Sequence, residues 1–152
     1  MVENSEKENI SKSAFRLLST RNRSKQELYE LLVKKGFREH LVTEIINQFE
    51  KKMFISDQKF AFEYAEHLIR VKKLGRIAVN FKFTKHKIPS SIVQPIINSL
   101  YDKYLPEKTI RETLIKLKYD PTGTMNQKNR ILNYLKRKGF EWDEIAQTIN
   151  SH

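Results

Sequence analysis

The stretch Ser24–Phe37, which reads SKQELYELLVKKGF, holds the pattern that decides the fold. Ser24 and Glu27 have the spacing of a capping box, in which each side chain bonds the backbone of the other at the start of a helix. A stripe of leucines at helical spacing follows. Two lysines then precede Gly36, which is the usual order at the end of a helix. The stretch therefore predicts one complete helix with both of its ends marked.

The apolar part of this pattern recurs twice further along the chain. With an offset of 51 residues and then of a further 52, Leu28 falls on Val79 and on Ile131. Other matched triplets are Leu32, Phe83 and Leu135; Phe37, Ile88 and Phe140; and Val42, Val93 and Ile145. Recurrence by residue type at a fixed period is the signature of a repeat architecture.

Helical patterns flank each copy, so the sequence predicts an all-α protein of three tandem three-helix repeats in an elongated, curved array. We expect a flexible N-terminal tail at residues 1–9 and repeats at residues 10–55, 56–105 and 106–152. The segment Ile77–Phe83 is rich in β-branched and aromatic residues and would also suit a strand. Helix is preferred, because a lone strand has no partner.

Composition excludes several classes of protein. The chain has no cysteine, which rules out disulfides and cysteine-based zinc sites. It has no apolar run long enough to span a bilayer, and its polar N-terminus is unlike a secretory signal, so we expect a cytoplasmic protein. Its four histidines are scattered, and no nucleophile elbow or phosphate-binding glycine loop occurs. We therefore expect a binding protein with no catalytic residue, metal or cofactor.

The net charge of +11 favours a polyanionic partner, and the charge is unevenly distributed. Residues 67–101 and 121–140 contain no acidic residue. Basic residues recur at two sets of repeat positions, one with Lys25, Arg76 and Lys128 and the other with Lys34, Lys85 and Arg137. The alternative is that these are ordinary solvated faces and cations at helix ends.

Phe81 stands where the other repeats have the polar residues Glu30 and Asn133. An exposed aromatic residue among cations could stack on a base or fill a notch on a protein. The alternative is that the middle repeat is rotated and that Phe81 is core. The predicted partner-binding residues are Arg70, Lys72, Lys73, Arg76, Phe81, Lys82, Lys85, Lys87, Lys128, Arg130 and Arg137.

The ordered set Arg23-Ser24, Glu27-Leu28, Lys35-Gly36-Phe37 and Phe60-Ala61, with Lys138-Gly139-Phe140 near the end, resembles the RecX family over about residues 10–150. The resemblance implies a monomeric, non-catalytic regulator of bacterial DNA repair, homologous recombination and the SOS response. It implies binding to the RecA filament on single-stranded DNA and inhibition of the recombinase, with double-stranded DNA as a further candidate partner. The middle repeat departs from the family pattern, because Ala78-Val79 and Lys87 replace its Glu-Leu pair and its glycine.

A helix-turn-helix-like protein that acts directly on DNA is the alternative reading. Three short helices with a glycine turn resemble such a unit, whose second helix enters the major groove. Three units in one chain would be unusual. We also expect no helix of this chain to concentrate Arg, Asn and Gln for contacts with base edges.

Overall fold

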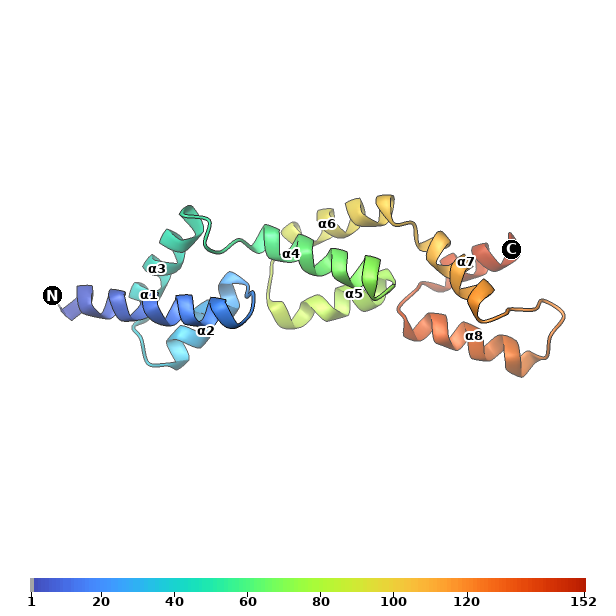
Figure 1. The fold of residues 1–152 in the computed structure, drawn as a ribbon, viewed down its shortest axis with the longest axis horizontal. Helices are drawn as coiled ribbons and strands as arrows, with labels where there is room; N and C mark the ends of the chain where they lie inside the picture. Colours follow the sequence, from blue (N-terminus) through green and yellow to red (C-terminus); the bar gives the residue numbers. More distant parts are fainter. Residues whose placement is uncertain (1) are drawn as a thin grey trace. The chain divides into compact units, whose positions relative to one another are not determined.

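The computed structural model describes residues 2–152, and every regular element in that range is helical (Figure 1). The α-helices are α1 (Val2–Thr20), α2 (Lys25–Lys34), α3 (Glu39–Lys51), α4 (Asp57–Glu66), α5 (Arg76–Phe83), α6 (Ser90–Lys103), α7 (Pro106–Lys116), α8 (Met125–Arg137) and α9 (Trp142–Asn150). A π-helical turn, η1 (His67–Val71), continues α4, and a 3₁₀ turn, η2 (Thr84–His86), continues α5. The all-α prediction is confirmed, including helix rather than strand at Ile77–Phe83.

The chain forms two compact units. The first comprises the residues up to Ala61 together with Thr84–Val93, and the second comprises Phe62–Phe83 and Gln94–His152. The expected middle repeat thus contributes residues to both units. The boundaries at residues 10–55, 56–105 and 106–152 stay predictions.

In the first unit, α1, α2 and α3 pack against one another around an apolar core (Figure 1). Ser24 caps α2 and forms the predicted capping box with Glu27. The core residues of this unit are Ile10, Ala14, Leu28, Leu32, Leu41, Val42, Ile45, Ile46, Phe49 and Ile55.

The expected flexible tail is wrong for residues 2–9, because α1 already begins at Val2. Glu6 is held against the start of α3: its carboxylate accepts hydrogen bonds from the Arg38 backbone N–H (2.9 Å) and from Arg38 Nε (3.1 Å). These bonds lower the pKa of the Glu6 carboxyl, and the bond from the Arg38 backbone has the largest effect. Burial raises the pKa by less than the bonds lower it. Polar residues at a chain end suggested a tail, but here they are the solvent-facing part of a packed helix.

In the second unit, α7, α8 and α9 enclose another core, in which α9 contacts both α7 and α8. Pro106 opens α7 at its first turn, where a missing backbone N–H costs no helical hydrogen bond. Thr124 and Gln127 form a further capping box at the start of α8. The buried residues of this core are Ile110, Leu114, Ile131, Leu135, Phe140 and Ile145.

The turns that end α2, α5 and α8 share a left-handed backbone residue. Gly36 has φ +100°, Lys87 has φ +55° and Gly139 has φ +93°. These residues occupy matched positions in the predicted repeats. The middle repeat therefore keeps the left-handed turn although it lacks the glycine, because Lys87 adopts that conformation.

Candidate partner-binding surface

Within the second unit, the start of α5 is bonded to the end of α8. The Gly75 N–H donates to the Lys138 carbonyl (2.8 Å), and the Ile77 N–H donates to the Gly139 carbonyl (3.1 Å). The first N–H groups of a helix and its last carbonyls lack partners within the helix, so each end here satisfies the other. Opposite ends of the two helix dipoles also meet, which is favourable. This joint places the turn after η1 beside the C-terminal end of α8.

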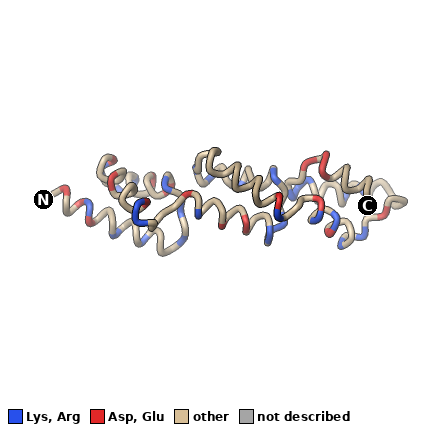
Figure 2. The backbone as a smooth tube through the Cα atoms, turned by 90° about the horizontal axis from the view of Figure 1, so that it is seen from above, with Lys and Arg blue, Asp and Glu red and all other residues tan. Residues whose placement is uncertain are grey.

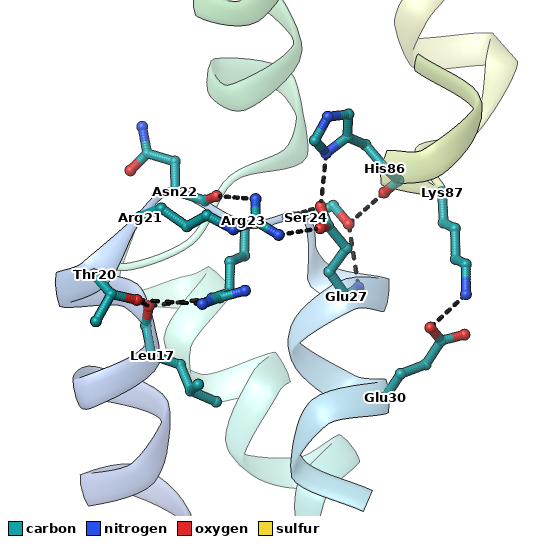
Figure 3. A network of polar contacts seen from close by, with 10 residues as sticks. All are labelled: Leu17, Thr20, Arg21, Asn22, Arg23, Ser24, Glu27, Glu30, His86 and Lys87. Atoms are coloured by element: carbon teal, nitrogen blue, oxygen red, sulfur yellow. Dashed lines mark hydrogen bonds and ion pairs between the residues drawn. The ribbon is translucent and has the colours of Figure 1, made fainter. Parts of the chain in front are cut away.

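A related joint lies in the first unit, at the start of α2 (Figure 3). Ser24 is fully buried, and its Oγ donates to the His86 carbonyl (2.5 Å) while accepting from the Glu27 N–H (3.2 Å). The Glu27 carboxylate lies 3.0 Å from His86 Nδ1 and 3.0 Å from an Arg21 nitrogen. Ser24 and His86 occupy the repeat positions of Gly75 and Lys138, so the same contact is made by a side chain here and by backbone there.

Glu27 makes this first joint dependent on pH. Burial raises the pKa of its carboxyl, but the hydrogen bonds with His86, Ser24 and Arg21 outweigh burial, and the pKa lies below its usual value. A lowered pKa in the folded state stabilises the protein above the usual carboxyl range, and that contribution is lost as pH falls through the lowered value. We expect Glu27→Gln to cost about 1 kcal/mol at pH 7.

The measurement is urea unfolding of the parent and of Glu27→Gln at pH 7 and at pH 3. Glutamine can still form the capping box, so the comparison isolates the charge. The difference in unfolding free energy should shrink at the lower pH. A difference that is the same at both pH values would contradict the assignment.

A groove of about 400 Å³ in the second unit carries four lysines. Lys72 and Lys73 come from the turn after η1, Lys116 from the end of α7, and Lys138 from the end of α8. We call it the lysine groove. Its remaining lining residues are Val71, Thr109, Glu112, Thr113, Leu117, Tyr134 and Phe140. The groove therefore combines four cations from three elements with apolar lining residues. Such a surface suits a partner that presents both an anionic group and an apolar group.

An internal contact holds the Lys138 side chain beside the turn that carries Lys72 and Lys73. Lys138 Nζ donates to the Lys72 carbonyl (3.2 Å) and lies 5.8 Å from the centre of the Tyr134 ring. Lys73 has a left-handed backbone, with φ +59°. Such a conformation costs energy for a residue other than glycine and is often found at functional sites.

Three of the predicted binding residues are engaged in contacts within their unit. Arg70 pairs with Glu66 one turn earlier (3.6 Å), and Lys87 pairs with Glu30. Arg76 donates to Asn98 Oδ1 (2.6 Å), and its guanidinium lies 5.0 Å from the centre of the Tyr101 ring. The ring is itself held, because the Tyr101 hydroxyl donates to the Leu74 carbonyl and burial raises the pKa of that hydroxyl.

Phe81 is 73% exposed, and Lys82 and Lys85 are exposed as well. The prediction that Phe81 faces solvent is confirmed, and the alternative that it is core is wrong.

Replacing this exposed ring should therefore cost little stability. We expect the melting temperature of Phe81→Ala to lie within about 2 °C of the parent's, because surface substitutions usually change stability by less than ~0.5 kcal/mol. Phe83→Ala, two residues away and buried, is the matched control, and should cost about 3 kcal/mol or more. Equal losses in the two variants would show that Phe81 supports the fold.

The predicted residues of the third repeat lie in two places. Lys128 and Arg130 line a hollow together with Lys118, Tyr119 and Asp120. Hydrogen bonds from Thr122 lower the pKa of the Asp120 carboxyl, so this hollow keeps one negative charge beside its cations. Arg137 is exposed near the end of α8.

The two recurring sets of cations differ in their surroundings. Lys25 pairs with Glu50 (2.8 Å), Arg76 lies against Tyr101, and Lys128 is half-buried. Lys34, Lys85 and Arg137 are all exposed. The second set is therefore the one whose members all face solvent. In Figure 2, the N-terminal helix, α1, carries both acidic and basic residues, whereas residues 67–101 and 121–140 contain no acidic residue.

Sequence reasoning missed several residues of this surface. Lys116 lies in a segment that also contains acidic residues, so a search for acid-free intervals passes over it. Tyr134 reads as one more residue of an amphipathic helix. The expectation that no helix concentrates Arg, Asn and Gln is wrong for the composition of α8, and a helical wheel drawn for Met125–Arg137 would have shown this; contact with base edges is a separate question.

In residues 2–152, no helix is both long and apolar enough to cross a membrane. Over the same residues, no group of three or more His, Cys, Asp or Glu side chains is placed to hold a metal ion.

Comparisons with known proteins identify the family. A family model described as the first three-helix domain of RecX matches residues 12–49. The regulatory protein RecX of Thermotoga petrophila is 31% identical over 137 residues, covering 90% of this chain and 80% of the relative. That of Chlorobium limicola is 27% identical over 136 residues, covering 90% of this chain and 84% of the relative.

The fold is similar to that of a solved structure. The crystal structure of RecX from Lactobacillus salivarius superposes with a TM-score of 0.85, covering 97% of each chain at 23% sequence identity. With a relative above 30% identity that is matched over most of its length, the family is shown. The chain belongs to the RecX family, a family of regulatory proteins rather than of enzymes.

Proposed function

We propose that this protein binds the filament that the RecA recombinase forms on single-stranded DNA and inhibits recombinase activity in DNA repair and recombination. Membership of the RecX family supports the choice of partner, since this family modulates RecA. The protein acts in the cytoplasm as a monomer, and it needs no cofactor.

The observation that carries the proposal is the lysine groove. The groove brings together cations from parts of the chain that are more than 60 residues apart. It lies beside the joint at which the start of α5 donates hydrogen bonds to the end of α8. Cations that are grouped on one surface steer association with an anionic surface and set the orientation of binding. The exposed Phe81 and Lys82 of the second unit add a second contact region with apolar and basic character, and Lys85 of the first unit is a further exposed cation.

The experiment is the effect of the purified protein on DNA-dependent ATP hydrolysis and strand exchange by RecA. We expect both rates to fall as the protein is added, at concentrations below those needed to coat the free DNA. Unchanged rates, together with no retention of the protein on recombinase-coated strands, would refute the proposal. Binding to one particular duplex sequence without any effect on RecA would instead favour the helix-turn-helix-like alternative.

A further inference from the structure

The outward face of α8 carries side chains that suit nucleic acid and no acidic residue. Six exposed residues follow one another at helical spacing and lie opposite the buried Ile131 and Leu135. They are Asn126, Asn129, Arg130, Asn133, Lys136 and Arg137. At 100° per residue they span about 120° of the helix surface, over a length of about 16 Å.

An ordinary solvated face would have a different composition. Exposed helix faces in proteins commonly mix acidic and basic residues, which stabilise the helix as pairs one turn apart. Asparagine is a weak helix former, because its side chain competes for backbone hydrogen bonds. Three asparagines on one face therefore weaken the helix, and packing does not explain them, since all three are exposed.

The first repeat provides an internal comparison. At the positions of Arg130 and Asn133 it has Glu27 and Glu30, and α2 accordingly presents a face of mixed charge. Glu30 there is bonded within the chain, to Gln26 and to Lys87. At these matched positions, α2 has acidic side chains that make contacts within the chain, whereas α8 has a cationic and an amide side chain, both exposed.

An aromatic side chain borders this face. Trp142, the first residue of α9, is 53% exposed, and Lys136 Nζ lies 5.1 Å from the centre of its ring. An exposed tryptophan beside cations is the kind of platform on which the bases of a single strand stack.

We propose that the outward face of α8, together with Trp142, binds single-stranded DNA directly. Arg130, Lys136 and Arg137 contact the phosphates, the asparagine amides bond base edges, and one base stacks on Trp142. The proposal rests on the proposed function, to which it adds the surface that meets the DNA. Single-stranded rather than duplex DNA is assigned, because stacking on Trp142 requires an unpaired base.

The chain contains one tryptophan, so its intrinsic fluorescence reports on Trp142 alone. The probe is a random-sequence single strand of about 20 nucleotides, labelled for anisotropy and used without recombinase. We expect tryptophan quenching that saturates together with the anisotropy change. Saturated anisotropy without quenching would overturn the stacking contact, and tighter binding to the matching duplex would overturn the choice of single strand.

Two double variants test the rest of the face. Arg130→Ala/Arg137→Ala should weaken binding at least tenfold and lower the salt slope by about 0.7 for each lost phosphate contact. Asn129→Ala/Asn133→Ala should weaken binding roughly fivefold with an unchanged slope, and because alanine is the better helix former the helix should persist. Circular dichroism checks the fold of each variant.

The matched control is Lys12→Ala/Arg16→Ala, which removes the same charge from exposed positions of α1. It should change the affinity less than twofold. Equal losses in the control and in Arg130→Ala/Arg137→Ala would overturn the proposal. The assay contains no RecA, so this result is independent of whether the protein inhibits the recombinase.

Discussion

Replacing Gly139 by alanine should destabilise the protein far more than the same change at Gly36. Both glycines have left-handed backbones, with φ +93° and φ +100°. They differ in their surroundings: a Cβ at Gly36 would meet no atom within 4 Å, whereas a Cβ at Gly139 would lie 2.3 Å from the Ala78 Cβ and 2.4 Å from its backbone nitrogen.

At Gly36, the left-handed backbone alone should make the alanine variant less stable by about 1–2 kcal/mol. At Gly139, overpacking against α5 adds to it, for a total of roughly 2–5 kcal/mol. Relief of the contact would require α5 to move away from α8 and would break the bonds that Gly75 and Ile77 donate. Chemical unfolding of both variants measures the difference.

Gly75→Ala separates the cost of overpacking from the cost of a left-handed backbone. A Cβ on this residue would lie 2.5 Å from backbone atoms of Gly139 and Phe140, without the left-handed φ. It should therefore cost roughly 1–3 kcal/mol from contact alone. Losses at Gly139 and Gly75 no larger than the loss at Gly36 would mean that the joint between α5 and α8 is looser than described.

Reversing the charge of the lysine groove should largely abolish the effect on RecA. We expect Lys72→Glu/Lys73→Glu to raise the concentration needed for half-inhibition of ATP hydrolysis by roughly tenfold or more, since like charges that face each other across an interface repel strongly. Both residues are exposed, so the melting temperature should change little.

Lys51→Glu/Lys52→Glu is the matched control, because Lys52 follows α3 as Lys72 follows η1. Each double variant changes the net charge by the same amount and places acidic residues at a helix C-terminus, so the penalty from the helix dipole is shared. The control should inhibit RecA nearly as well as the parent. If both variants lose inhibition equally, net charge rather than the groove carries the effect.

Much of the local structure could be predicted from the chain alone. The capping box at Ser24, the left-handed turn at Gly36 and helix rather than strand at Ile77–Phe83 all follow from patterns within a few residues, or from their recurrence. Such signals are strong because helix periodicity and helix ends are decided by neighbours along the chain. The exposure of Phe81 followed in the same way, from the polar residues at its matched positions.

Other predictions failed where a distant partner decides the outcome. The polar N-terminal residues form a packed helix, because Arg38 bonds Glu6 across 32 residues of sequence. The contact of Arg76 with the ring of Tyr101, 25 residues away in the sequence, has no local signal either, and its role in partner binding stays a prediction. No local pattern shows such a partner.

The sequence by itself therefore determined the all-helical class, the ends of the helices that carry capping signals, such as α2, and the segments that are free of negative charge. Only the tertiary structure decided which cations are engaged within the chain and which meet in one groove. Periodicity and capping act over one or two turns of backbone. Lys72 and Lys138 come together because helix ends more than 60 residues apart satisfy each other's hydrogen bonds, at a joint with room only for glycine, and α7 contributes Lys116 to the same groove.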